Sequence, residues 1–423
     1  MNTNNTILIK GARIFDGKSP DLIEGQDVLV EQGKITRISK DIKAPDGVIT
    51  IDAAGLTLIP GLIDAHWHSV YANISMAALL QSDFGYITLA AAKGAGETLM
   101  RGFTTVRDIG GNCFAVKKAT DEGMIVGPRV YPSGAPISQT SGHFDFRGPN
   151  DVPANSTHPL TYPERNSIVM IADGVPEVIK RVREQLRMGA TQIKLAAGGG
   201  VSSLYDHLDV AEYTYEEMKA AVDVAKTWNT YVAVHVFTDD AVQTALRAGV
   251  VSIEHGNLLH DETFEMMAEK GAWLSMQPIL NDEDAIPFPE GSFQQEKFIQ
   301  VTDGTSRGIE LAKKHGVKVA FGTDCLFDPE LARKQGKLLA KLQRWYTPFE
   351  ALKMATHDNA QLVKLCGPRD PYPGKLGVVE EGALADLILV DGNPLENIDL
   401  VVDPDSNFKV IMKDGQVYKN TVN

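Results

Sequence analysis

Five short apolar segments of this chain carry, at or near their C-terminal ends, residue types that bind metal ions. The segments are 62–68, 191–194, 231–235, 251–255 and 319–324. Their polar ends supply the imidazoles of His66, His68, His235 and His255, the amine of Lys194 and the carboxylate of Asp324. Parallel strands in a closed barrel deliver the residues at their C-terminal ends to one mouth. The pattern therefore predicts a site at which two metal ions activate water for hydrolysis.

His66 and His68 form an H-x-H pair, and side chains two residues apart on a strand point to the same face. Both imidazoles can therefore reach one metal ion. An isolated H-x-H pair also occurs by chance. Here it ends the run P-G-L-I-D-A-H-W-H over residues 60–68, which is much more specific.

The elements that must position these residues alternate between strand-like and helix-like runs from residue 62 to about residue 365. Expected strands are 62–68, 103–109, 129–137, 191–196, 230–236, 250–255, 272–277 and 317–323. Amphipathic segments with apolar residues at three- and four-residue spacing are 176–188, 215–228, 239–248, 261–270 and 305–315. This alternation implies a parallel sheet, and eight strands favour a closed barrel. We therefore predict an α/β fold with a (β/α)8 TIM barrel over residues 61–375.

Both ends of the chain are rich in short strands separated by turns. Expected strands are 6–10, 13–15, 27–31, 34–38 and 48–52, and then 386–390, 408–413 and 416–419. Asp414-Gly415 is a hairpin-turn signal between the last two. The similar texture of the two ends predicts that residues 1–60 and 376–423 form one small β-sandwich domain.

Two long segments follow predicted strands and do not fit a minimal barrel. Residues 138–172 are rich in Ser, Pro, Asn and Gly, and residues 278–300 are rich in Pro, Glu and Gln. Because both start at C-terminal strand ends, we expect them to overhang the mouth of the barrel. Long loops of this kind are usually functional, and a surface or subunit-contact insertion is the alternative.

Composition narrows the class of partner. The 423 residues carry a formal net charge of −14, which argues against nucleic acid or an anionic membrane as the main partner. The three cysteines include no CxxC pair, so neither a zinc knuckle nor a disulfide framework is indicated. The first residues lack a signal-peptide pattern, and no apolar run approaches the roughly 20 residues of a membrane span. We expect a cytoplasmic protein that acts on a small molecule.

The run over residues 60–68 resembles the first-strand signature of the amidohydrolase superfamily, and the resemblance extends over nearly the whole chain. Within that superfamily the chain looks like the branch of metal-dependent dipeptidases, with prolidase-like enzymes and a mycotoxin amidase. Imidazolonepropionase is a more distant relative. The closer resemblance lies in Ile193-Lys194-Leu195, in Val234-His235-Val236 and in S-I-E-H-G-N-L at residues 252–258.

The resemblance implies that Lys194 reacts with CO2 and becomes a carbamate bridging two divalent metal ions. It assigns His235 and His255 to the second, more exposed metal. It assigns Asp324 to the first metal and to the proton transfer from the bridging water to the leaving amine. Zinc is the expected metal, although cobalt, manganese and iron suit the same ligands. The structural alternatives are a salt-bridged Lys194, a core His235, a His255 paired with Glu254, and an Asp324 that caps a helix.

Substrate contacts are implied less directly. In dipeptidase-like members a histidine of the loop after strand 3 polarises the scissile carbonyl, and we assign this role to His143. Arg147 could meet a substrate carboxylate or pair with Asp145. Related dipeptidases often place a tyrosine two positions after the strand-5 histidine, where this chain has Phe237. This departure leaves room for a bulkier or less charged substrate, with Tyr205, His207 and Tyr213 as further candidate contacts.

The resulting hypothesis is a binuclear amidohydrolase that cleaves an amide bond of a dipeptide or N-acyl amino acid by a metal-bridging hydroxide, as an Xaa-Pro dipeptidase does. Alternatives are a cyclic amide hydrolase similar to imidazolonepropionase and a mycotoxin or N-acyl amide amidase. A deaminase is disfavoured because deaminases lack the lysine and carry H-x-x-E where this chain has Thr238. A non-catalytic scaffold would have lost ligands that are all present here. The resemblance also implies a homo-oligomer.

Overall fold

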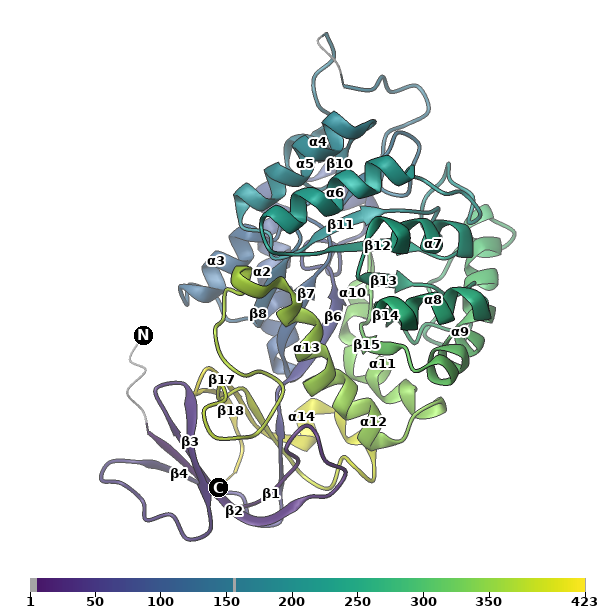
Figure 1. Ribbon diagram of the computed structural model, residues 1–423. Coiled ribbons are helices and arrows are strands. Elements are labelled where there is room, and N and C mark those ends of the chain that lie inside the picture. Colours follow the sequence, from purple (N-terminus) through teal and green to yellow (C-terminus); the bar gives the residue numbers. More distant parts are fainter. Residues whose placement is uncertain (1–5, 155–156, 423) are drawn as a thin grey trace.

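The structure is a computed structural model that describes residues 6–154 and 157–422. The middle of the chain forms two parallel sheets (Figure 1). One has the order β6 (Leu62–Trp67), β7 (Phe103–Asp108), β8 (Arg129–Pro132). The other has the order β10 (Met170–Ile171), β9 (Ile137–Ser138), β11 (Ile193–Ala196), β12 (Val232–Val236), β13 (Ser252–His255), β14 (Trp273–Met276), β15 (Lys318–Phe321). The α/β class with parallel strands is therefore confirmed.

Backbone hydrogen bonds join the two sheets on both sides. The N–H of Thr191, just before β11, donates to the carbonyl of Pro132 at the end of β8 over 2.7 Å. The N–H of Asp324, just after β15, donates to the carbonyl of His66 on β6 over 2.9 Å. The second bond brings the C-terminal ends of β6 and β15 together.

Helices follow the strands of the larger sheet, as their apolar periodicity predicted. They are α5 (Val175–Met188), α6 (Tyr215–Thr227), α7 (Asp239–Ala248), α8 (Asp261–Lys270) and α9 (Phe293–His315). Figure 1 shows α5 to α8 succeeding one another along one side of that sheet. Buried residues of these helices, such as Val178 and Leu246, pack with strand residues such as Val234 in one apolar core. Helices α7 and α8 stop at Gly249 and Gly271, whose positive φ angles suit glycine.

Further helices surround the smaller sheet and follow β15. They are α1 (Met76–Gln81), α2 (Phe84–Met100), α3 (Phe114–Asp121), α4 (Tyr162–Arg165), α10 (Pro329–Arg333), α11 (Gln335–Lys341), α12 (Pro348–Lys353), α13 (Asn359–Val363) and α14 (Pro404–Asn407).

The structure differs from the predicted elements at several places. The strands expected at 6–10 and 13–15 are one strand, β1 (Ile7–Ile14). The strand expected at 129–137 is interrupted after Pro132, because Gly134 has a positive φ of 74° and Pro136 has no N–H for a ladder. Its last part is β9, which pairs with β11 of the other sheet. The loop expected at 278–300 ends early, since α9 already begins at Phe293. Ser292 caps that helix by accepting a hydrogen bond from the N–H of Gln295.

The two chain ends meet in one eight-stranded sheet. Its order is β18 (Gln416–Asn420), β17 (Phe408–Lys413), β16 (Leu387–Val390), β5 (Thr57–Pro60), β1 (Ile7–Ile14), β2 (Ile23–Glu31), β3 (Lys34–Ser39), and β4 (Ile49–Asp52) pairs with β1. Strand β5, which the sequence analysis missed, pairs antiparallel with β16 and so links the ends. Asp414 and Gly415 both have positive φ and form the predicted hairpin turn. Packing of this sheet as a sandwich stays a prediction.

Within the residues that the structure describes, no helix combines the length and the apolar character needed to cross a membrane.

Candidate metal centre

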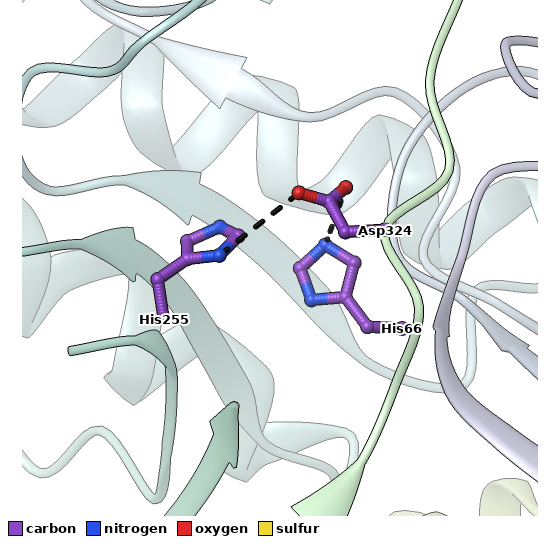
Figure 2. Close-up of side chains that lie close together, drawn as sticks. All are labelled: His66, His255 and Asp324. Carbon is purple, nitrogen blue, oxygen red and sulfur yellow. Dashed lines mark ion pairs between the residues drawn. The ribbon is translucent and has the colours of Figure 1, made fainter. Parts of the chain in front are cut away.

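Three imidazoles gather around the carboxylate of Asp324 where the strands end. His66 lies in β6, His68 directly follows that strand, His255 ends β13, and Asp324 follows β15. The Asp324 Oδ1 atom lies 3.3 Å from Nε2 of His66 and 3.2 Å from Nε2 of His68. Ligand atoms of His66, His255 and Asp324 all lie within 4.8 Å of one another (Figure 2). One metal ion could therefore contact all three residues.

His235 and His143 extend this group on the β12 side. The ring of His235 packs edge-on against His255 with centroids 4.6 Å apart. His143 stacks on His235 with centroids 3.9 Å apart and an interplanar angle of 10°. His143 and five of the six predicted ligands thus form one continuous cluster of side chains.

Lys194 is buried beside the same cluster. It lies on β11 and is 1% exposed, and β11 pairs with β12 so that Ala196 faces His235. Among the described residues it forms no ion pair within 4.0 Å, which disagrees with the alternative of a salt-bridged lysine. Burial lowers the pKa of Lys194 to about 8, although the charges of Glu254 and Asp324 act in the opposite direction. Its amine is therefore neutral far more often than that of an exposed lysine.

The charge states and free atoms of these residues fit divalent metal ions. The buried Oδ1 of Asp324 has no hydrogen-bond partner in the described part of the chain, so its lone pairs are available. Burial lowers the pKa of His235 well below its ordinary value and that of His255 to about 3. Both rings are therefore neutral, as metal ligands must be. Imidazole nitrogens and carboxylate oxygens suit zinc, cobalt, manganese or iron.

Hydrogen bonds at the far ring nitrogen orient the imidazoles. The Nδ1 atom of His68 lies 3.0 Å from the carbonyl oxygen of Gly110, and Nδ1 of His255 lies 2.6 Å from Oε1 of Gln277. Both partners accept hydrogen bonds, so each Nδ1 carries the proton and each Nε2 is free to bind a metal.

The backbone is unusual at two of the candidate ligands. His255 and Asp324 have φ angles of 77° and 50°, a region that non-glycine residues rarely adopt. Strained backbone of this kind clusters at functional sites. Gly322 packs so closely on β6 that a Cβ atom there would lie 2.4 Å from Cβ of His66. The close approach of β15 to β6 therefore requires glycine before Asp324.

His143 is held by residues of the loop that follows β11. Its backbone N–H donates to Oε1 of Glu212 over 2.7 Å, and its Nδ1 lies 2.9 Å from Oγ of Ser203. The carboxylate of Asp206 lies 3.6 Å from the same nitrogen. A Cβ atom at Gly200 would lie 1.8 Å from Nδ1, so the ring needs a glycine there. This loop fixes the position of His143 next to the metal ligands.

A cavity opens over the cluster and is lined mainly by apolar side chains. His143, His235, His255 and Asp324 form part of its wall. Its apolar lining residues are Val201, Phe237, Ile279, Ile286, Phe288, Phe298, Val301 and Leu326. The 278–300 segment thus covers the site, as predicted. No lysine or arginine is among the lining residues that the structure describes.

Nearby cations are engaged elsewhere. The buried amine of Lys297 donates to the backbone carbonyls of Gly200, Ser203 and Asp206. Lys337 and Lys341 pair with Asp284, which fastens the 278–300 segment to α11. These contacts shape the cavity wall without adding positive charge to it.

Two predicted substrate contacts lie away from the cavity. Arg147 pairs with Asp145 over 2.6 Å, which was the alternative considered for it, and both residues line a separate hollow. Tyr205 is 44% exposed and does not line the cavity. Phe237 does line it, and its ring lies edge-on to His235.

The hydrogen-bond partners of the ligands had no signal in the sequence. Glu254 had been considered as a partner of His255, yet its Oε2 atom lies 2.8 Å from Nδ1 of His66. The partner of His255 is Gln277, one residue after β14. No local pattern marks either residue, because each contact joins different strands.

Comparisons with known proteins point to one protein family. A profile of the amidohydrolase family matches residues 57–423. Ochratoxinase of Aspergillus niger is 33% identical over 378 residues, which are 86% of this chain and 75% of that protein. A crystal structure of an amidohydrolase is 35% identical with a TM-score of 0.89, covering 99% of this chain and 100% of that one. A crystal structure of a prolidase complexed with N-methylphosphonate-L-proline is 31% identical with a TM-score of 0.90 and the same coverage.

The chain belongs to the amidohydrolase family, in a peptidase-like branch whose members include prolidase and ochratoxinase. It is an enzyme, a hydrolase of carbon–nitrogen bonds of the amide or peptide type. The resemblance noted in the sequence is thereby confirmed.

Proposed function

We propose that the protein is a binuclear metal-dependent amidohydrolase that cleaves the amide bond of a dipeptide or an N-acyl amino acid. The observation that carries the proposal is the convergence of His66, His68 and His255 on the carboxylate of Asp324, beside buried Lys194. The prolidase and ochratoxinase relatives support the choice of an amide bond.

Six residues would hold the two metal ions: His66, His68, Lys194, His235, His255 and Asp324. For Lys194 this requires reaction with CO2: the neutral amine attacks the carbon, an N–C bond forms, and a proton is released. The product is an anionic carbamate in place of a cation that would repel metal. When bound, two divalent metals acidify water and polarise a carbonyl oxygen, and zinc is the metal we expect.

Asp324 and His143 would take separate roles in the reaction. The pKa of Asp324 lies well below its ordinary value, because burial, which raises it, is outweighed by the neighbouring imidazoles of His66 and His68, which favour the ionised carboxylate. Its ionised carboxylate accepts a proton from the attacking water and passes it to the leaving amine. His143 lines the cavity beside the metal ligands, where its imidazole would contact the carbonyl oxygen of the substrate.

The apolar lining of the cavity favours a substrate with a bulky apolar group. A free carboxylate on the substrate would meet no lysine or arginine among the described lining residues, whereas an apolar group would pack on Phe237, Phe288 and Phe298. The second candidate is therefore an N-acyl amide amidase that accepts a bulky apolar substrate. Ring opening of a cyclic amide uses the same chemistry and is the third.

The test is a substrate panel with metal-replete protein. Dipeptides, N-acyl amino acids, N-acyl amides and cyclic amides are compared by kcat/KM. We expect cleavage of at least one open-chain amide, with a preference for apolar substituents. Folded, metal-replete protein that cleaves none of these amides would contradict the proposal.

Replacing Phe237 with tyrosine tests how the cavity selects its substrate. We expect Phe237→Tyr to raise kcat/KM for an N-acyl amino acid by roughly tenfold, because the new hydroxyl can donate to the substrate carboxylate. The matched neutral substrate, with the carboxylate converted to an amide, should show no such gain. Equal changes for both substrates would mean that residue 237 does not read the carboxylate.

The lowered pKa of Lys194 predicts how carboxylation depends on pH. Only the neutral amine reacts with CO2, and burial lowers its pKa from 10.5 to about 8. At a fixed concentration of dissolved CO2, uptake by metal-free protein should therefore rise as the pH increases through about 8. Native mass spectrometry measures the increment. An increment that persists in Lys194→Ala, or that appears only near the ordinary lysine pKa, would refute this prediction.

We further propose that the two parallel sheets close into a (β/α)8 barrel over residues 61–375. The bonds from Thr191 to Pro132 and from Asp324 to His66 support this closure. Residues 1–60 and 376–423 would form the second domain, as a β-sandwich. Self-association and a cytoplasmic location complete the proposal.

A further inference from the structure

A buried ion pair lies directly behind the candidate metal centre. Glu254 on β13 and Arg107 on β7 are both 0% exposed. One guanidinium nitrogen of Arg107 donates to both carboxylate oxygens of Glu254, over 2.9 and 2.8 Å. Ser252 donates its hydroxyl to Oε1 of Glu254 over 2.6 Å. The carboxylate is therefore ionised and held on more than one side.

The same pair holds His66 at two points. Oε2 of Glu254 lies 2.8 Å from Nδ1 of the His66 ring. Nε of Arg107 donates to the backbone carbonyl of Ala65, the residue before His66. Ring and backbone of His66 are thus fixed by two residues from two other strands.

This arrangement selects the tautomer of His66. An ionised carboxylate can only accept hydrogen bonds, so Nδ1 of His66 must be the donor. The proton is then on Nδ1, and the lone pair is on Nε2, which points at Oδ1 of Asp324 from 3.3 Å. The negative charge of Glu254 also makes Nε2 a stronger ligand.

We propose that Glu254, clamped by Arg107, is a positioning residue that fixes the tautomer and orientation of His66 for metal binding. This inference rests on the proposed metal-dependent function. It assigns a role in metal binding to Glu254 and Arg107, which would contact neither substrate nor metal. Partners of this kind typically change metal affinity by about 10- to 100-fold when they are lost. A purely structural ion pair would affect folding and leave metal affinity unchanged.

The test measures metal affinity instead of activity. Glu254→Gln keeps the shape of the side chain and removes its charge. Asp386→Asn is the matched control, because Asp386 is also a buried carboxylate in a pair with an arginine, Arg129, at 2.9 Å. Wild type and both variants are loaded with zinc, and the metal retained is measured against a graded chelator.

We expect Glu254→Gln to bind zinc at least about tenfold more weakly than wild type, with Asp386→Asn within a factor of about two. The visible spectrum of the cobalt-substituted protein should change in Glu254→Gln and not in the control. If Glu254→Gln does not fold, Glu254→Asp serves, since it keeps the charge beside Arg107 and shortens the reach to His66. It should show the same weakening.

Three results would overturn the inference. Folded Glu254 variants with wild-type zinc affinity would show that His66 does not depend on this contact. If Asp386→Asn weakened zinc binding equally, the loss of affinity would reflect lower protein stability and not the contact with His66. Wild-type protein that binds no metal would contradict the proposed function itself. Wild-type protein that binds zinc, with Glu254 variants of equal affinity, would contradict only the role of Glu254.

Discussion

Replacing Asp324 with asparagine will lower kcat/KM for the amide substrate by about 10³-fold or more. The amide of asparagine cannot accept the proton of the attacking water, and general acid–base catalysis contributes roughly 10²- to 10⁴-fold. The loss should include a metal effect, because the oxygen that faces His66 and His68 is a carboxylate oxygen only in the wild type. Steady-state kinetics and metal content of the same preparations separate the two contributions.

The control for this variant is Asp223→Asn on helix α6. Asp223 is an exposed carboxylate that pairs with Lys219 on the same helix, so its loss should leave kinetics and metal content unchanged. If Asp324→Asn kept most of its activity with two metals bound, Asp324 could not be the proton acceptor.

Replacing Lys194 with alanine will remove one metal ion or both and lower kcat by about 10²-fold or more. The carbamate proposed on Lys194 is the anion shared by both metals, and electrostatic groups at the reacting centre are each worth about 10²- to 10³-fold. Elemental analysis should show fewer than two metals per chain, and the mass increment of one CO2 should vanish.

Lys413→Ala is the matched control, because Lys413 is also a buried lysine. Its amine donates to the carbonyl of Gly127 over 2.8 Å, away from the cavity. This variant should keep the metals and the increment, even if it is less stable. Retention of two metals by Lys194→Ala would show that Lys194 does not bridge them.

The sequence predicted the strands of the site well because their signals are local. Each run is apolar and carries a polar residue at or near its end, as in β12 with His235 and β13 with His255. Helices α7 and α8 match their predicted bounds, since apolar periodicity marks each helix and a glycine follows its last residue. These features depend on residues close together in the chain.

What the sequence could not predict depends on contacts between distant segments. The contact of Glu254 with His66 joins β13 to β6, across 188 positions. Strand β5 is short and becomes a strand by pairing with β16 near the other end of the chain. Arg147 could have faced substrate or Asp145, and only the folded loop shows the pair with Asp145.

The cavity lining shows the same limit. Ile279, Ile286 and Phe288 come from a segment that was expected to overhang the mouth, but no pattern in it shows which of its residues face the cavity. Ion pairs of Asp284 with Lys334, just before α11, and with Lys337 and Lys341 of α11 hold this segment in place. Tyr205 is exposed, whereas Phe237 lines the cavity. No pattern in the sequence distinguishes these two aromatic residues.

The central claim, a pair of metals bridged by a carboxylated Lys194, is tested most directly by metal content together with native intact mass, with and without bicarbonate. The account predicts two divalent metals per chain and a mass increment of one CO2 that depends on Lys194. A single metal without the increment, or no metal at all, would contradict it.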